Sequence, residues 1–189
     1  MRFRRASRRR TRIEDERTMA AGEGQGGDIK GIRSASVSEW LEGNISGLKA
    51  PFRFALIAGG HSNLTYKVDD AAGTSVVLRR PPTGAVLATA HDMAREHKII
   101  SAVSKTDVPV PQALGLCEDE SVNDAPFYVM NHVDGIVLND AKITRDNLDE
   151  PARLALSEHT AEVLAALHTI EPADIGLGDL GKREDYIAR

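Results

Sequence analysis

Strand-like segments fill the middle of this chain and give way to helix-like segments towards its end, and this order restricts the folds it can adopt. Three short apolar runs come first, at residues 52–58, 64–68 and 75–79. Because the loops between them are short, neighbouring strands must run antiparallel, as in a meander. A helix is predicted over residues 91–103, where apolar residues recur every three or four positions. Two further strands, at residues 113–117 and 127–130, complete a five-stranded sheet.

Helical patterns stand before and after these strands. A short amphipathic helix is predicted to begin near Ser36 and to cover the first strands with Trp40 and Leu41. Beyond Gly135 a long helix is predicted over residues 153–170, because an apolar stripe of helical period runs through it. The predicted fold class is therefore α+β, a five-stranded antiparallel sheet with a helix, followed by further helices.

The first 35 residues differ in composition from the rest. Residues 1–18 carry eight arginines and three acids, whereas the whole chain has a formal net charge of −4. An arginine run can attract nucleic acid, but this one lacks the interleaved aromatics and helical spacing of a base reader, so nucleic-acid binding is not expected. We predict a disordered tail and Gly-rich linker over residues 1–35, with Met1 and Met19 as alternative starts, followed by segments 36–134 and 135–189.

The overall composition indicates a soluble globular protein. Hydrophobic residues make up 41% of the 189 positions and charged residues 28%. No apolar stretch approaches the roughly 18 residues of a membrane-spanning helix, so no membrane partner is expected. Cys117 is the single cysteine and is interpreted as a small buried hydrophobe, which favours a reducing, cytoplasmic location. The six scattered histidines lack metal-ligand spacing and predict no metal site.

Five strings along the chain together resemble one enzyme family. They are VLRRPP, AREHKIISAV, DVPVPQALGLCED, PFYVMNHVDG and ALHTIEPADIGLGDLG. Their order is similar to that of the aminoglycoside phosphotransferase and choline kinase-like family, in the branch found beside or fused to acyl-CoA dehydrogenases, and the match covers residues 36–189. The resemblance implies the N-lobe of a protein kinase-like fold followed by the first helices of an incomplete C-lobe. It also implies ATP with magnesium as the phosphoryl donor and a small hydroxylated molecule as acceptor.

A Gly-containing turn joins the first two predicted strands. It consists of Gly59, Gly60, His61, Ser62 and Asn63. Glycine permits the close backbone approach that phosphate binding needs, and a serine hydroxyl can add a hydrogen bond. The turn is therefore a candidate loop over the nucleotide phosphates, with a plain hairpin turn as the alternative.

Arg79 ends the third strand, where the resemblance places a cation against the nucleotide phosphates. Glu96, in the following helix, is predicted to pair with Arg79 and hold it in position. Strand alternation puts Arg80, the competing cation, on the opposite face, and puts Val77 on the face of Arg79, where it would line the adenine pocket. Ordinary surface charges are the alternative interpretation of Arg79 and Glu96.

Residues 127–133 match the hinge between the two lobes of the family. The carbonyl of Asn131 and the N–H of Val133 are expected to contact adenine, with Met130 behind them. Relatives often carry an acid and an aromatic where this chain has Asn131 and His132, which is a mild departure.

Two strings imitate catalytic motifs without their context. Residues 132–139 satisfy the kinase pattern H-x-D-x-x-x-x-N, but they precede the long helix instead of following it. Residues 179–181, Asp-Leu-Gly, imitate a magnesium-binding triplet but follow no apolar strand. Since no histidine–glycine–aspartate loop follows residue 170, the chain is expected to bind nucleotide without turnover.

Two functions from different classes therefore stay open. The first is an ATP-dependent phosphotransferase represented by its N-lobe, and the second is a non-catalytic, pseudokinase-like nucleotide-binding module. An incomplete C-lobe would expose apolar surface, so association of the chain through that surface is also expected.

Overall fold

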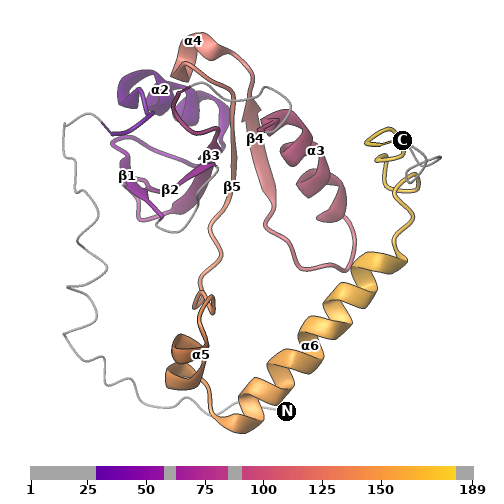
Figure 1. The fold of residues 1–189 in the computed structure, drawn as a ribbon. Coiled ribbons are helices and arrows are strands. Elements are labelled where there is room, and N and C mark those ends of the chain that lie inside the picture. Colours follow the sequence, from indigo (N-terminus) through magenta and orange to yellow (C-terminus); the bar gives the residue numbers. More distant parts are fainter. Residues whose placement is uncertain (1–28, 58–62, 85–90, 182–189) are drawn as a thin grey trace.

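The computed structural model describes residues 29–57, 63–84 and 91–181, and its centre is a five-stranded sheet (Figure 1). The strands are β1 Arg53–Leu56, β2 Leu64–Asp69, β3 Ser75–Arg80, β4 Ala113–Cys117 and β5 Phe127–Asn131. Their order in the sheet is β1-β2-β3-β5-β4, and every neighbouring pair is antiparallel. The predicted meander of the first three strands and the five-stranded antiparallel sheet are confirmed.

Helix α2, Ser34–Asn44, packs on one face of this sheet. Val37 and Leu41 of α2 are fully buried in the main hydrophobic core with side chains of every strand. The Trp40 ring meets the Phe127 ring edge-on, with 4.9 Å between centroids. Gly115 of β4 makes room for this helix, because a Cβ there would lie 2.8 Å from Cδ1 of Ile45 and 3.2 Å from Cη2 of Trp40. The predicted cover over the first strands thus extends across the whole sheet.

Helix α3, Met93–Val103, contacts β4 and β5. It packs on the opposite face from α2, since Tyr128, which alternates with the α2-facing residues of β5, lies against the ring of His97 at 6.2 Å. Asp92 caps the helix by accepting a hydrogen bond from the backbone N–H of Arg95 at 2.8 Å. The sheet is therefore sandwiched between two helices, and the site residues are divided between its faces.

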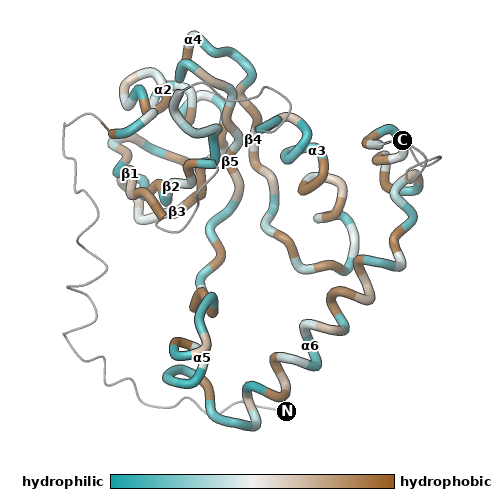
Figure 2. The backbone as a smooth tube through the Cα atoms, in the orientation of Figure 1, coloured by the Kyte–Doolittle hydropathy of each residue, from teal (hydrophilic) through white to brown (hydrophobic). Residues whose placement is uncertain are grey.

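Two short helices were not predicted from the sequence: α4, Glu120–Asn123, and α5, Ala141–Asn147. The long helix α6, Glu150–Thr169, is confirmed, and Asp149 caps its start. It has no buried residue and extends away from the sheet (Figure 1). Hydrophobic segments recur along it (Figure 2). Several of its leucine side chains are exposed, so the described residues do not cover its predicted apolar stripe.

Packed structure is present ahead of the segment boundary predicted at residue 36. Ile29 and Ile32 form an isolated bridge, Ile32 is buried, and the carbonyl of Lys30 accepts a hydrogen bond from the hydroxyl of Tyr66. The arginine-rich residues 1–18 lie outside the described residues. Within the described part, no helix is both long and apolar enough to cross a membrane.

Candidate functional site

Arg79 lies in a row of three residues on the α3-facing side of the sheet. Its register partners are Thr65 on β2 and Tyr128 on β5. The Nε–H of Arg79 donates to Oε2 of Glu96 at 2.9 Å, and Nη1 donates to Oγ1 of Thr65 at 3.0 Å. The predicted pair between strand β3 and helix α3 is present. The side chains of Arg79 and Glu96 are 31% and 30% exposed, so the ion pair is partly shielded from water but can be reached from outside.

Both carboxylate oxygens of Glu96 are held by other side chains as well. Oε1 accepts from Nδ2 of Asn63 at 2.8 Å, and Oε2 accepts from the hydroxyl of Tyr128 at 3.2 Å in addition to Arg79. Burial, and then the negative charge of Glu96, raise the pKa of Tyr128, so its hydroxyl keeps its proton and remains a donor. Three elements of the fold thus fix the carboxylate that orients Arg79.

Next to this row lies a second row, Lys67, Val77 and Met130, on the same face. Val77 is 7% exposed and Met130 is half-buried, so the row offers an apolar surface one step along the strands from the guanidinium. Strand alternation therefore places Val77 and Arg79 on one face, as the sequence predicts, and the register of β5 adds Met130 to that face. The low exposure of Val77 means that Met130 is the more accessible of the two apolar side chains.

Asn63 has a different environment from the one expected of a phosphate-binding turn. It is 5% exposed, and besides its bond to Glu96 its Oδ1 lies 2.6 Å from Nδ1 of His91. The other four residues predicted for that turn, Gly59, Gly60, His61 and Ser62, lie outside the described residues.

The predicted hinge, residues 127–133, consists of β5 and the two residues that follow it. The N–H of Asn131 donates to the carbonyl of Gln112 at 3.0 Å, and its side-chain Oδ1 accepts from the N–H of Gln112 at 2.5 Å. Its side chain therefore fastens the end of β5 to the segment before β4. Val133, two residues later, is 63% exposed, so the chain leaves the sheet between these two positions.

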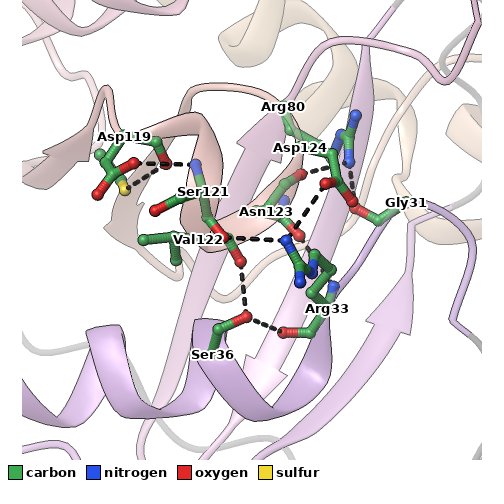
Figure 3. A network of polar contacts seen from close by, with 10 residues as sticks. Gly31, Arg33, Ser36, Arg80, Asp119, Ser121, Val122, Asn123 and Asp124 are labelled. Atoms are coloured by element: carbon green, nitrogen blue, oxygen red, sulfur yellow. Dashed lines mark hydrogen bonds and ion pairs between the residues drawn. The ribbon is translucent and has the colours of Figure 1, made fainter.

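The side chain of Arg80 is buried on the face of the sheet opposite to that of Arg79. It is 4% exposed on the α2 side, where Nε donates to the carbonyl of Pro81 at 2.9 Å and Nη1 donates to the carbonyls of Gly31 and Asn123 (Figure 3). Burial lowers the pKa of its guanidinium, which is the cost of holding a charge there. Of the two adjacent arginines, Arg79 is the one that shares a face with Glu96.

A cavity of about 580 Å³ lies at the opposite end of the sheet from the hinge. It is lined by Arg80, the loop after β3, the start of α3 and the loop between β4 and β5. Arg79, Glu96 and Met130 do not line it. The position of this cavity therefore does not support the predicted nucleotide site. The support comes from the side-chain geometry around Arg79.

The two strings that imitate catalytic motifs have ordinary surroundings. The side chain of Asp134 is fully exposed, and its Oδ1 lies 3.4 Å from Nδ1 of His132. Asp179 accepts two hydrogen bonds from Nζ of Lys98 on α3, at 2.8 and 3.0 Å, and these bonds lower the pKa of its carboxyl. Among the described residues no group of three or more histidine, cysteine, aspartate or glutamate side chains could hold a metal ion.

The sequence pattern of a phosphotransferase enzyme family, APH, matches residues 53–189, which includes the sheet, the Arg79–Glu96 pair and the helices that follow. The chain belongs to this family. The match covers well over half of the chain, and the resemblance inferred from its motifs is confirmed.

The individual relatives agree with this assignment. The chain is 37% identical over 130 residues to mouse acyl-CoA dehydrogenase family member 10, covering 69% of this chain and 12% of the relative. It is 32% identical over 160 residues to human acyl-CoA dehydrogenase family member 11, covering 82% of this chain and 20% of the relative. The predicted branch beside acyl-CoA dehydrogenases is therefore confirmed, and the phosphotransferase-family chain spans one fifth or less of these curated relatives.

A solved structure supports the kinase-like fold. A protein from Ralstonia eutropha assigned to the aminoglycoside phosphotransferases superposes with a TM-score of 0.63 at 34% sequence identity. The superposition covers 78% of this chain and 41% of that protein. The predicted α+β, kinase-like fold class is confirmed at this level.

Sequence reasoning missed two contributors to the site, Tyr128 and His91. Tyr128 was treated as part of the hinge string, yet its alternation with Phe127 and Val129 already places it on the face of Arg79. His91 carried no usable signal, because its contact with Asn63 joins residues 28 positions apart.

Proposed function

We propose that this chain binds ATP with magnesium as the nucleotide-binding part of an ATP-dependent phosphotransferase that acts on a small hydroxylated molecule. The observation that carries the proposal is the ion pair between Arg79 and Glu96, braced by Asn63 and Tyr128. Family membership supplies the reaction class, and the ion pair supplies a cation positioned for phosphate oxygens.

The donor set around Arg79 fits a nucleoside triphosphate. Nε and Nη1 of the guanidinium are used by Glu96 and Thr65, and Nη2 has no hydrogen-bond partner among the described residues. A guanidinium already fixed at Nε and Nη1 presents Nη2 to an anion with little further loss of side-chain entropy. Met130 and Val77 give an apolar surface beside it, and the backbone of Asn131 and Val133 is proposed to contact adenine as in a kinase hinge.

Binding without transfer is the activity we propose for the 189 residues taken alone. Phosphoryl transfer depends on positioned metal ions and a group that orients the attacking hydroxyl. The sequence after α6 carries no histidine–glycine–aspartate loop to provide them. A non-catalytic nucleotide-binding module is the second candidate for the same reason. Either candidate predicts that the 189 residues alone do not turn over ATP. Formation of ADP above the buffer rate, with or without hydroxylated acceptors, would contradict this prediction.

The test of nucleotide binding is a thermal shift with ATP and magnesium. At a ligand concentration of 100 times the dissociation constant, binding stabilises the folded state by about 2.7 kcal/mol, or roughly 5–10 °C in Tm for a chain of this size. Arg79→Ala should lose most of this shift, whereas Arg145→Ala, an exposed arginine on α5, should keep it. A wild-type protein whose Tm does not respond to ATP would refute the proposal.

A cytoplasmic location and the absence of nucleic-acid binding remain proposals from the composition. Deleting residues 1–18 tests the second of them. Loss of measurable polynucleotide affinity on deletion would show that the arginine-rich segment binds nucleic acid after all.

A further inference from the structure

Asn63 links His91, two residues before helix α3, to Glu96 within that helix. The Glu96 carboxylate can only accept hydrogen bonds, so Nδ2 of Asn63 donates to Oε1 over 2.8 Å. The amide oxygen of Asn63 therefore faces Nδ1 of His91 at 2.6 Å, and Nδ1 must carry the proton. His91 thus donates to Asn63 and Asn63 donates to Glu96, whose other oxygen accepts from Arg79.

The two oxygens of Glu96 are held by different groups. Arg79 and Tyr128 both donate to Oε2, whereas Asn63 donates to Oε1. A carboxylate held at one oxygen can rotate about its last bond, and a second bond at the other oxygen fixes its plane. The Nε–H of Arg79 needs that plane to be aligned for a linear bond. Asn63 therefore controls a degree of freedom that the ion pair alone leaves open.

The burial of Asn63 argues against direct contact with phosphate. The residue is 5% exposed, and both ends of its amide are already engaged. The second N–H of Nδ2 could reach a phosphate only if the groups that cover this buried side chain moved, and turning the amide towards a ligand would break its bond to Glu96 or His91. Because Asn63 lies directly before β2, its bond to Glu96 links the start of this strand to α3.

We propose that Asn63, oriented by His91, is a positioning residue that fixes the Glu96 carboxylate and thereby presents Arg79 to the nucleotide, and that it does not bind the phosphates itself. This role rests on the proposed nucleotide site. It also assigns His91 a role in fixing which way the Asn63 amide faces.

A double-mutant cycle tests the proposal by isothermal titration with ATP and magnesium, using wild type, Asn63→Ala, Glu96→Ala and the double variant. Asn63→Ala should weaken binding about tenfold, and in the Glu96→Ala background it should cause no further loss, because both changes remove the same constraint. Losses that multiply would mean that Asn63 contacts the nucleotide independently and would overturn the proposal. Asn147→Ala on α5 is the matched control and should bind like wild type.

A second measurement decides the role of Asn63 without nucleotide. Hydrogen exchange of the Arg79 Nε–H, identified by ¹⁵N NMR from the signal lost in Arg79→Lys, reports how firmly Glu96 holds it. Asn63→Ala and His91→Phe should each accelerate this exchange about tenfold in a folded protein, and Asn147→Ala should not. An unchanged exchange rate would overturn the proposal. If wild type fails to bind ATP, the proposed function fails, and this exchange rate still decides whether Asn63 positions Glu96.

Discussion

Replacing Arg80 with methionine should destabilise the fold far more than the same change at Arg79. Arg80 is 4% exposed and donates to three backbone carbonyls, that of Pro81 and those of Gly31 and Asn123; Figure 3 shows the last two residues. Methionine fills a similar volume but leaves these acceptors unpaired, at about 2 kcal/mol each, while relief of the buried charge offsets about half of the total. The net loss expected is about 3 kcal/mol. Arg79→Met removes the ion pair with Glu96, whose side chains are about 30% exposed, and should lower the free energy of unfolding by about 1 kcal/mol.

Urea denaturation followed by Trp40 fluorescence measures this difference, because Trp40 is the single tryptophan and packs on Phe127 of the sheet. With an m-value of about 2 kcal/mol per molar, Arg80→Met should lower the midpoint by about 1.5 M and Arg79→Met by about 0.5 M. ATP should shift the Arg80→Met midpoint and leave that of Arg79→Met unchanged. Equal destabilisation by the two changes, or a normal midpoint for Arg80→Met, would refute the division of roles.

Three further predictions concern stability and association. Burial alone would raise the pKa of Asp69, but hydrogen bonds from side chains of β1, β2 and β3 lower it from 3.8 to about 2. The contribution of Asp69 to folding stability is therefore complete above about pH 4 and is lost as the pH falls towards 2. Asp69→Asn should remove that part of the pH dependence in thermal melts, and an unchanged acid limb would contradict it. Gly115→Ala should lower stability by about 1 kcal/mol and alter Trp40 emission, since the added Cβ meets Ile45 and Trp40; an unaltered spectrum would contradict this. Leu154→Lys with Leu164→Lys should reduce self-association in sedimentation, because both side chains are exposed on α6; a monodisperse wild-type monomer would contradict it.

The sheet was predictable because its signals are local. Short loops, alternating apolar residues and turn residues determine strand identity and antiparallel order. Helix α4 was missed because it is a single turn within a polar loop, and contacts from Arg33 and Arg80 to Asn123 hold it in place. Those partners lie 90 and 43 residues away, so no window of neighbouring residues contains the information.

The long helix shows a different limit. Periodicity predicted α6 and an apolar stripe along it, and the helix is present. The same pattern does not say what covers the stripe, and Leu154 remains 62% exposed among the described residues. Local sequence therefore identifies a face that favours burial but not its partner.

In the candidate site, too, local patterns were predictable from the sequence and contacts between distant residues were not. Alternation along β3 and family resemblance were enough to pair Arg79 with Glu96, since each signal is contained in one strand or one string. The braces supplied by Asn63, His91 and Tyr128 depend on contacts across 28 to 33 positions, which the sequence alone did not indicate.

The register of β3 determines which of its two adjacent arginines, Arg79 or Arg80, faces Glu96. A slip of one residue would exchange the two faces of the strand, moving Arg79 into the core under α2 and Arg80 to the face of Glu96. Charge alone would not prevent this exchange, since both residues are arginine. The carbonyls of Gly31, Pro81 and Asn123 do prevent it, because they form a receptor for one guanidinium on the α2 side, and Val76 and Leu78 fill the core positions that alternate with Val77 and Arg79. The buried contacts of Arg80 thus determine that Arg79, and not its neighbour, meets Glu96.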